Sequence, residues 1–269
     1  MRTLRSTWTE FVASVGEVLL GVLADLGGMA RLGARLFVLT VRPPHFPRNL
    51  LLAMEAIGFG SLSVVVLTAF FAGAVFALQI SLAFSLFNAQ SLVGASIGLS
   101  MARELAPVLT GLMVTGRAGS AIATELGTMR VSEQIDALAT MAVEPEHYLL
   151  VPRVLAGILT LPLLTLVFNM VAILAAAFVA VNVENLSVAE FWSRIPKWVE
   201  LKDVVGGLIK SSVFGLILAL AGCYKGYNAT GGARGVGIAT TQAVVLASVL
   251  ILVSDYLLTT LMLPWWRSS

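Results

Sequence analysis

The sequence predicts an all-α, polytopic membrane protein. Of its 269 residues, 58% are hydrophobic and 12% are charged, whereas a soluble domain carries about 25% charged residues. The apolar residues gather in runs of about twenty or more, the length a helix needs to cross a bilayer. The sequence lacks the ten-residue alternation of an outer-membrane β-barrel. We therefore expect one N-terminal amphipathic helix followed by five transmembrane helices.

The N-terminal region, residues 1–49, predicts an interfacial helix and an elbow. Apolar residues in 4–29 recur at steps of three and four, and charged residues interrupt the other faces. This pattern is typical of a helix lying in the membrane surface, although a coiled coil or a core helix would also produce it. Four arginines and three prolines follow in 31–48. Because prolines break helices, this stretch should turn the chain into the membrane.

Residues 50–269 complete a single domain with five expected spans. The third span is long enough to reach ~45 Å, beyond the ~30 Å hydrocarbon core, so it must tilt, kink at Pro162 or project into water. Between the third and fourth spans, 183–203 should form an outer segment with a short interfacial helix that carries Trp192 and Trp198. The expected spans are approximately residues 57–82, 93–116, 152–181, 204–224 and 238–263.

Basic residues predict the orientation of the spans. If the N-terminus is cytoplasmic, that side receives eleven lysines and arginines, counting Arg153 at the start of the third span, and the opposite side receives four. Cytoplasmic loops carry the excess of basic residues. The N-terminus and residues 117–147 are therefore predicted to face the cytoplasm, and the C-terminus the opposite side.

The segment 117–147 is amphipathic and holds five of the chain's fifteen carboxylates. It predicts a helix with Ser132 as N-cap and Pro145 as the residue that ends it. The helix would be either a solvated connection or a docking site for a cytosolic partner, and periodicity alone does not choose between them. One face of this helix would carry Val131, Ile135, Leu138 and Ala142.

Four ionisable residues fall inside the expected spans, at similar depth in the outer half of the bilayer: Arg103, Glu104, Lys210 and Asp255. Charged groups in spans are costly and usually face a protein interior or a water-filled cavity. Arg103 and Glu104 are adjacent on a helix and cannot face each other, so each needs a partner from another span. We expect a buried polar network joining the second, fourth and fifth spans beneath an outward-facing cavity. A purely structural charge cluster is the alternative.

The remaining sequence motifs mainly exclude a disulfide, a metal site, a nucleotide-binding loop and an enzyme active site. An aromatic stripe beginning at Phe76 would either pack or line a lipid cavity, and it contains Phe76, Ile80, Phe84 and Phe87. The glycine-rich stretch 225–237 lacks GxxxxGK[ST] and reads as a tight cytoplasmic turn. The single cysteine, Cys223, excludes an internal disulfide, and neither His45 nor His147 has metal-ligand spacing. No Ser/His/Asp or Cys/His arrangement suggests an enzyme, and a net charge of +2 does not suggest nucleic-acid binding.

Residues 103–145, RELAPVLTGLMVTGRAGSAIATELGTMRVSEQIDALATMAVEP, resemble the signature of the MlaE-type permease family. The segments LIKSSVFG (208–215) and SDYLLTTLM (254–262) extend the resemblance, which covers nearly the whole chain. Members are membrane subunits of ABC transporters that move phospholipids between the inner and outer membranes of bacteria.

The resemblance implies a homodimeric permease in the bacterial inner membrane, with a cytoplasmic N-terminus and a periplasmic C-terminus. Lipid would occupy an outward-open cavity at the dimer interface, with Arg103, Glu104, Lys210 and Asp255 beneath it. A coupling helix at about 128–143 would dock into a cytosolic ATPase. The cavity would be lined by Phe76, Ile80, Phe84, Phe87 and Leu105, and the coupling residues would be Glu125, Arg130, Glu133, Asp136, Leu138 and Met141.

The resemblance also implies partners. An MCE-domain periplasmic protein would cover the outer face, and a small STAS-domain subunit can join the ATPase. ATP and Mg²⁺ would be bound by the ATPase, so the permease itself would be non-catalytic and need no cofactor. The competing interpretations are a stand-alone ion- or proton-coupled carrier using Glu104 and Asp255, and an integral-membrane enzyme. The lack of a histidine or acidic cluster at a membrane face disfavours the enzyme.

Overall fold

A computed structural model of the chain describes residues 2–44 and 46–267, with all their side chains except those of 2–15, 18, 19 and 267. The chain divides into two units, Met1–His45 and Phe46–Ser269. His45 and the side chains of the predicted apolar face at Leu4, Trp8, Phe11, Val15 and Val18 lie outside the described residues.

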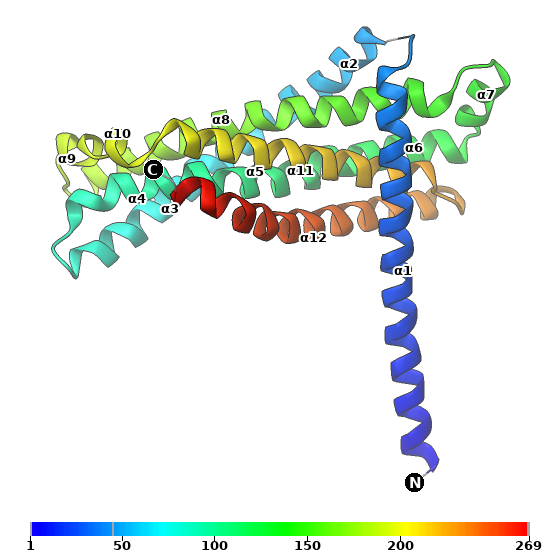
Figure 1. Cartoon of the computed structure of the whole chain (residues 1–269), viewed down its shortest axis with the longest axis horizontal. Coiled ribbons are helices and arrows are strands. Elements are labelled where there is room, and N and C mark those ends of the chain that lie inside the picture. Colours follow the sequence, from blue (N-terminus) through cyan, green and yellow to red (C-terminus); the bar gives the residue numbers. More distant parts are fainter. Residues whose placement is uncertain (1, 45, 268–269) are drawn as a thin grey trace. The chain divides into compact units, whose positions relative to one another are not determined.

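The first unit consists of α1 (Arg2–Val41), a continuous helix of 40 residues (Figure 1). The predicted end at residue 29 was wrong, because α1 continues through Arg31 and Arg35 to Val41. The chain meets its first prolines only at Pro43 and Pro44, and the elbow is confined to the residues between Val41 and Pro47.

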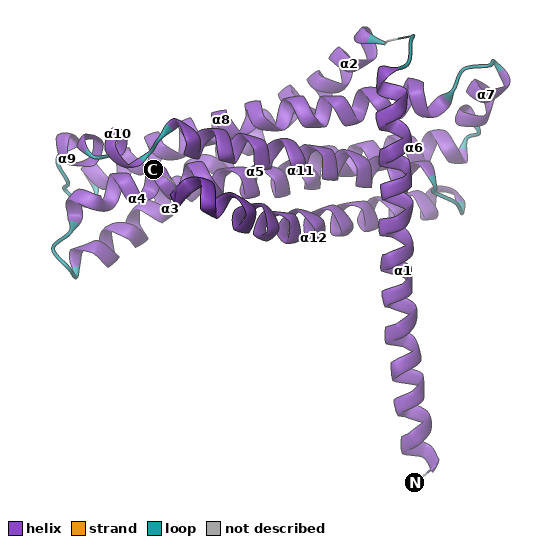
Figure 2. Ribbon diagram, viewed as in Figure 1, coloured by secondary structure: helices purple, strands orange, loops and turns teal. Residues whose placement is uncertain are grey.

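The second unit contains five helical segments that are long and apolar enough to cross a membrane, which confirms the predicted spans. Among the described residues the secondary structure is helical, joined by short loops (Figure 2). Each segment is longer than its predicted apolar run, because the helices extend beyond it. The five segments are Pro47–Ser85, Gln90–Val131, Glu146–Asn182, Leu201–Tyr227 and Gly232–Trp266.

The first three segments alternate α-helix with π-helical turns. The first comprises α2 (Pro47–Met54), η1 (Glu55–Phe59) and α3 (Gly60–Ser85). The third comprises η5 (Glu146–Leu150) and α8 (Val151–Asn182), which is continuous through Pro162. The second comprises η2 (a 3₁₀ turn, Gln90–Leu92), α4 (Val93–Ser100), η3 (Met101–Leu105), α5 (Ala106–Val114), η4 (Thr115–Gly119) and α6 (Ser120–Val131).

The last two spans are α11 (Leu201–Tyr227) and α12 (Gly232–Arg267). The predicted turn at 225–237 is shorter than expected, and its positive φ angles of 87° at Gly231 and 68° at Gly232 suit glycine. The outer segment holds two short helices, α9 (Val188–Ser193) and α10 (Ile195–Trp198). In Figure 1, α9 and α10 lie at one end of the five-span unit and α7 (Gln134–Thr140) at the other. We name these the α9 end and the α7 end.

Small residues hold the spans close together. The buried face of α3 recurs every four residues, and a Cβ on its Gly73 would overlap the backbone carbonyl of Ala172 in α8. Gly157 of α8 and Gly215 of α11 face each other in the same way. In a membrane, such close backbone approach replaces the hydrophobic effect as a source of helix association. The α3 face consists of Ser61, Val65, Ala69, Gly73, Ala77 and Ser81.

Candidate functional site

A buried lysine joins three spans near the α9 end. The side chain of Lys210 on α11 is fully buried. Its Nζ lies 2.5 Å from Oε2 of Glu104 on η3 and 3.1 Å from Oδ1 of Asp255 on α12. It also donates to the hydroxyl of Thr259 at 2.6 Å. The structure therefore brings three of the four predicted charges together, and it adds a threonine that the charge pattern could not indicate. We call these four residues the Lys210 cluster.

The fourth predicted charge, Arg103, has a different partner. Its Nε and Nη2 lie 2.9 and 2.8 Å from Oδ1 of Asp203, in the first turn of α11. Arg103 therefore has a partner from another span, as expected, but that partner is not one of the four predicted charges. Asp203 is buried, and its Oδ2 also accepts a hydrogen bond from the backbone N–H of Glu200 at 2.9 Å. Asp203 was not predicted, because it falls within the expected outer connection, residues 183–203.

Helix geometry explains why two adjacent charges diverge. Neighbouring side chains on a helix point about 100° apart, so residues 103 and 104 of η3 face different parts of α11. Arg103 reaches Asp203 in the first turn of α11, whereas Glu104 reaches Lys210, about two turns further along the same helix. The Trp266 ring lies beside both cations, with its centroid 4.7 Å from Arg103 Cζ and 5.5 Å from Lys210 Nζ. Such cation–π contacts connect the Arg103–Asp203 pair to the Lys210 cluster.

An apolar groove of about 450 Å³ lies between α3 and the η3–α5 region. We call it the η3 groove, because Met101 and Leu105 of that turn contribute to its wall. Phe71, Val75 and Phe76 supply the α3 side, and Gln79 is one of the few polar residues. The same five-residue turn thus carries two residues of the groove wall and two charged residues, Arg103 and Glu104.

The other three residues predicted for a lipid cavity do not line this groove. Ile80 and Phe84 are half-buried further along α3. Phe87 lies in the turn after α3 and is 79% exposed, so the expected stripe ends before it. The helical spacing assumed for Phe87 failed because α3 ends at Ser85.

The segment predicted as one coupling helix at 128–143 is broken. The helix α6 ends at Val131, and Glu133 adopts a left-handed φ of 60° before α7 begins at Gln134. Ser132 is not the N-cap: its hydroxyl donates to the carbonyl of Thr128 at 2.7 Å. Ala142, with φ of 57°, follows the end of α7, and Pro145 precedes η5 rather than ending the helix.

Residues 132–143, which we call the α7 segment, bury one side chain and leave most of the others exposed. Ile135 is 1% exposed, whereas Leu138 is half-buried and Met141 is 71% exposed. Arg130 at the end of α6 pairs with Asp136 at 2.6 Å on the surface. Of the predicted coupling residues, Glu125 lies elsewhere on α6 and pairs with Arg153 of α8 at 2.6 Å.

Comparison with known proteins places these features in a larger group. Residues 50–261 match the sequence profile of the family described as Permease MlaE. A probable ABC transporter permease protein of Rickettsia conorii is 46% identical over 221 residues, or 82% of this chain and 85% of that protein. The intermembrane phospholipid transport system permease protein MlaE of Haemophilus influenzae is 33% identical over 258 residues, or 94% and 97%.

A plant protein is similar as well. The chloroplastic TRIGALACTOSYLDIACYLGLYCEROL 1 protein of Arabidopsis thaliana is 40% identical over 211 residues, or 78% of this chain and 60% of that protein. The profile match of residues 50–261 includes the Lys210 cluster, the η3 groove and the α7 segment.

Proposed function

The chain belongs to the MlaE permease family, and from this premise we propose that it is the membrane subunit of an ABC transporter that moves phospholipid across the envelope of a bacterium. On this proposal it resides in the inner membrane as a dimer, with the α7 end in the cytoplasm and the α9 end toward the periplasm. The name of the Haemophilus influenzae relative, a phospholipid transport permease, supports the cargo.

The observation that carries the proposal is the shared π turn. Through η3, an apolar groove of about 450 Å³ is built next to Arg103 and Glu104, which are half-buried and paired with the buried Asp203 and Lys210. Ligand sites typically have volumes of about 300–1,000 Å³ with apolar walls and a few placed polar groups. An acyl chain matches the apolar wall of Phe76 and Leu105. The charged residues would then form a fixed polar base that the lipid tail does not enter.

A second copy of the chain would close the groove. The spans Pro47–Ser85 and Gly232–Trp266 are the least buried of the five, at 28% of their most apolar windows. Their exposed apolar side chains include Val249, Leu252 and Tyr256 on α12. These faces suit contact with lipid tails or with the partner copy, and an outward cavity between two copies would join their two grooves.

The driving force would come from a separate ATPase. The chain is proposed to be non-catalytic, with ATP and Mg²⁺ bound by the ATPase and no cofactor of its own. The exposed side of the α7 segment, with Met141 and the half-buried Leu138 beside it, would dock into that ATPase. Its movement would shift the spans between two packings that bind lipid with different affinity, which requires no covalent step in this chain. An MCE-domain protein at the α9 end would exchange lipid with the cavity, and a STAS-domain subunit can join the ATPase.

The proposal is tested by purifying the tagged chain in mild detergent and analysing proteins and lipids by mass spectrometry. We expect an ABC ATPase and a glycerophospholipid to co-purify. Met141→Asp should lose the ATPase and keep the lipid, whereas Leu105→Arg should keep the ATPase and lose the lipid. Purification of a folded chain without any ATPase, together with transport driven by a proton gradient through Glu104 and Asp255, would instead establish the stand-alone carrier.

A further inference from the structure

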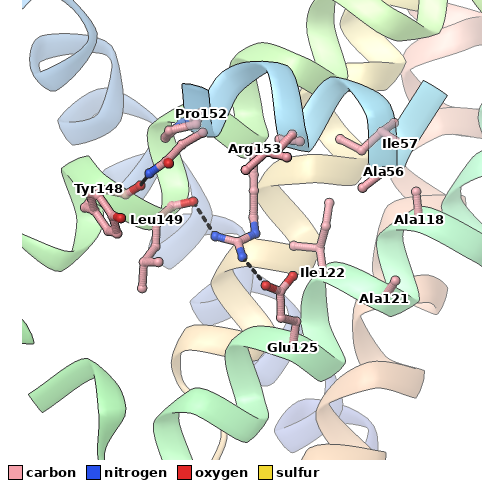
Figure 3. A pocket seen from close by; sticks show the side chains of 13 residues that line it. Ala56, Ile57, Ala118, Ala121, Ile122, Glu125, Tyr148, Leu149, Pro152 and Arg153 are labelled. Carbon is pink, nitrogen blue, oxygen red and sulfur yellow. Dashed lines mark hydrogen bonds and ion pairs between the residues drawn. The ribbon is translucent and has the colours of Figure 1, made fainter. Parts of the chain in front are cut away.

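A second cavity, of about 320 Å³, lies near the α7 end and shares no lining residue with the η3 groove. It is enclosed by three spanning segments: α2 and η1, η4 and α6, and η5 and α8. Figure 3 shows the walls converging on the side chain of Arg153, which extends from α8 toward α6. None of its residues belongs to the Lys210 cluster, so the transport proposal leaves this cavity unexplained.

The walls of the cavity are mostly apolar, and several of the residues that line it have small side chains. Alanines on two facing segments, Ala56 of η1 and Ala118 and Ala121 of η4–α6, leave the space open. Of the four π turns in the described residues, three border the cavity: η1, η4 and η5. Single π turns inside α-helices are rare and occur frequently at functional sites. Their concentration around one cavity indicates that the cavity itself is used.

An arginine fixes two of these walls relative to each other. Arg117 of η4 donates through Nη1 to the backbone carbonyl of Ala56 at 3.1 Å and lies 3.3 Å from the hydroxyl of Ser61. Its guanidinium occupies the space beside Gly60, where any Cβ would overlap it. Arg117 thereby ties η4 to η1 and to the start of α3.

The rim of the cavity carries one charge of each sign. Glu125 pairs with Arg153 at 2.6 Å, and Arg153 also donates through Nη1 to the carbonyl of Leu149 at 2.7 Å. The carboxylate side chain is 59% exposed and the arginine side chain 14% exposed. A further polar contact joins Asn49 to the carbonyl of Tyr148 at 3.4 Å. The cavity is therefore apolar inside and balanced in charge at its mouth.

We propose that this cavity binds one acyl chain of a phosphatidylethanolamine molecule from the leaflet at the α7 end. The three segments that form it all begin or end there, so its rim lies at the level of lipid headgroups. A zwitterionic headgroup matches the rim, with its ammonium toward Glu125 and its phosphate toward Arg153. Binding would exchange the partners of the Glu125–Arg153 pair: a phosphate that takes Arg153 leaves Glu125 without its cation, which the ammonium of a zwitterionic headgroup replaces and an anionic headgroup does not.

The size of the cavity restricts the occupant to part of a lipid. At about 320 Å³ it lies at the lower limit of typical ligand sites, which is enough for a segment of one chain with the second chain remaining in the bilayer. The bound lipid would be a resident component of the permease rather than its cargo. This inference requires only that the chain spans a membrane, so it does not rest on the transport proposal.

The test uses the complex purified from its native membrane and two photoactivatable lipids, phosphatidylethanolamine and phosphatidylglycerol, each with a diazirine in the same acyl chain. After illumination, the labelled residues are mapped by mass spectrometry. We expect phosphatidylethanolamine to label residues 52–57 and 118–122 at least fivefold more than phosphatidylglycerol does. Ala121 is exposed and lines the cavity, so Ala121→Leu should narrow the cavity without disturbing buried packing. We expect it to reduce that labelling at least fivefold.

Two controls separate this cavity from the transport site. Ala83→Leu, an equal enlargement at an exposed position of α3 outside both cavities, should leave the labelling unchanged. Labelling of Phe76 and Leu105 in the η3 groove should persist in Ala121→Leu, so the two sites fail independently. Glu125→Gln should remove the preference for phosphatidylethanolamine. Equal labelling by both lipids, or labelling of residues 52–57 that Ala121→Leu does not reduce, would overturn the proposal.

Discussion

The Lys210 cluster and the α7 segment differ in whether their side chains find partners within this chain. In the cluster, a fully buried ammonium has two carboxylates and a hydroxyl within 3.1 Å, all from this chain. In the α7 segment, only Ile135 is buried, and Met141 presents 71% of its surface to solvent. One region is complete as it stands, whereas the other has apolar surface without a partner among the described residues.

Substitutions in the two regions should therefore have different effects, one on folding and the other on partner binding. Changes in the cluster should disturb the fold first, because removing one member of a buried ion pair leaves an uncompensated charge. Changes on the exposed side of the α7 segment should leave the fold intact and affect only what binds there. The following predictions are ordered from the largest expected effect to the smallest.

The largest effect should follow Lys210→Met. Glu104 and Asp255 would then lie near each other without their shared cation, and we expect a loss of about 3–5 kcal/mol in the free energy of unfolding. Thermal unfolding in detergent measures it. The triple variant Glu104→Gln, Lys210→Met, Asp255→Asn removes all charge and should recover most of the stability, but lipid transport should stay lost. Normal transport by the stable triple variant would mean that the cluster only fixes helix packing.

Within the α7 segment, one buried and one exposed apolar residue should behave oppositely. Ile135→Ala should destabilise the segment by about 2–4 kcal/mol, because it opens a cavity at the single buried anchor. Hydrogen exchange of the α7 amides measures this loss. Met141→Ala should change stability by less than about 0.5 kcal/mol. It should nevertheless raise the Kd for the ATPase about tenfold, the effect of losing about 1.4 kcal/mol at an interface. Equal loss of protection in both variants would contradict the contrast.

Gly207→Ala tests whether the cluster depends on close backbone contact. A Cβ at this position on α11 would overlap the carbonyl oxygen of Ala102 in η3. We expect a cost of about 1–3 kcal/mol, since the helices must separate. The control is Gly237→Ala on α12, where a Cβ has no neighbour within 4 Å. That substitution should stabilise the helix by about 0.5–1 kcal/mol. Equal destabilisation by both variants would contradict the claim that close packing at Gly207 is what the substitution disturbs.

The smallest effect should follow Arg130→Ala. Its ion pair with Asp136 is short, at 2.6 Å, but both side chains are substantially exposed. Exposed pairs contribute about 0–1 kcal/mol, so thermal unfolding should barely change. A loss of ATPase binding larger than that of Met141→Ala would show that the docking surface includes this pair.

The sequence predicted the five spans well, because hydropathy depends on local composition rather than on tertiary contacts. The predicted bounds were too narrow, since the second span continues as α6 to Val131 and the third begins with η5 at Glu146. Pro145 was read as a terminator, yet proline is also favoured at the start of a helix, which is where it lies. Periodicity could not reveal the left-handed residues Glu133 and Ala142 that divide the α7 segment.

The charged site was predictable in part for a physical reason. Charges within apolar runs are rare enough to identify Glu104, Lys210 and Asp255, and their similar depth predicted that they would meet. Along the helices, Lys210 lies about 14 Å and Asp255 about 18 Å from the α9 end at 1.5 Å per residue. The partner of Arg103 was not predictable in the same way, because Asp203 precedes the apolar run of the fourth span and only the observed start of α11 at Leu201 places it on that helix.

The most direct test of the central claim is reconstituted transport. The chain is placed in vesicles with or without its co-purified ATPase, and movement of a fluorescent phospholipid is followed after adding ATP and Mg²⁺ or imposing a proton gradient. We predict transport only with the ATPase and ATP, and its loss when Met141→Asp prevents docking. Transport by the chain alone under a proton gradient, abolished by Glu104→Gln, would contradict the account.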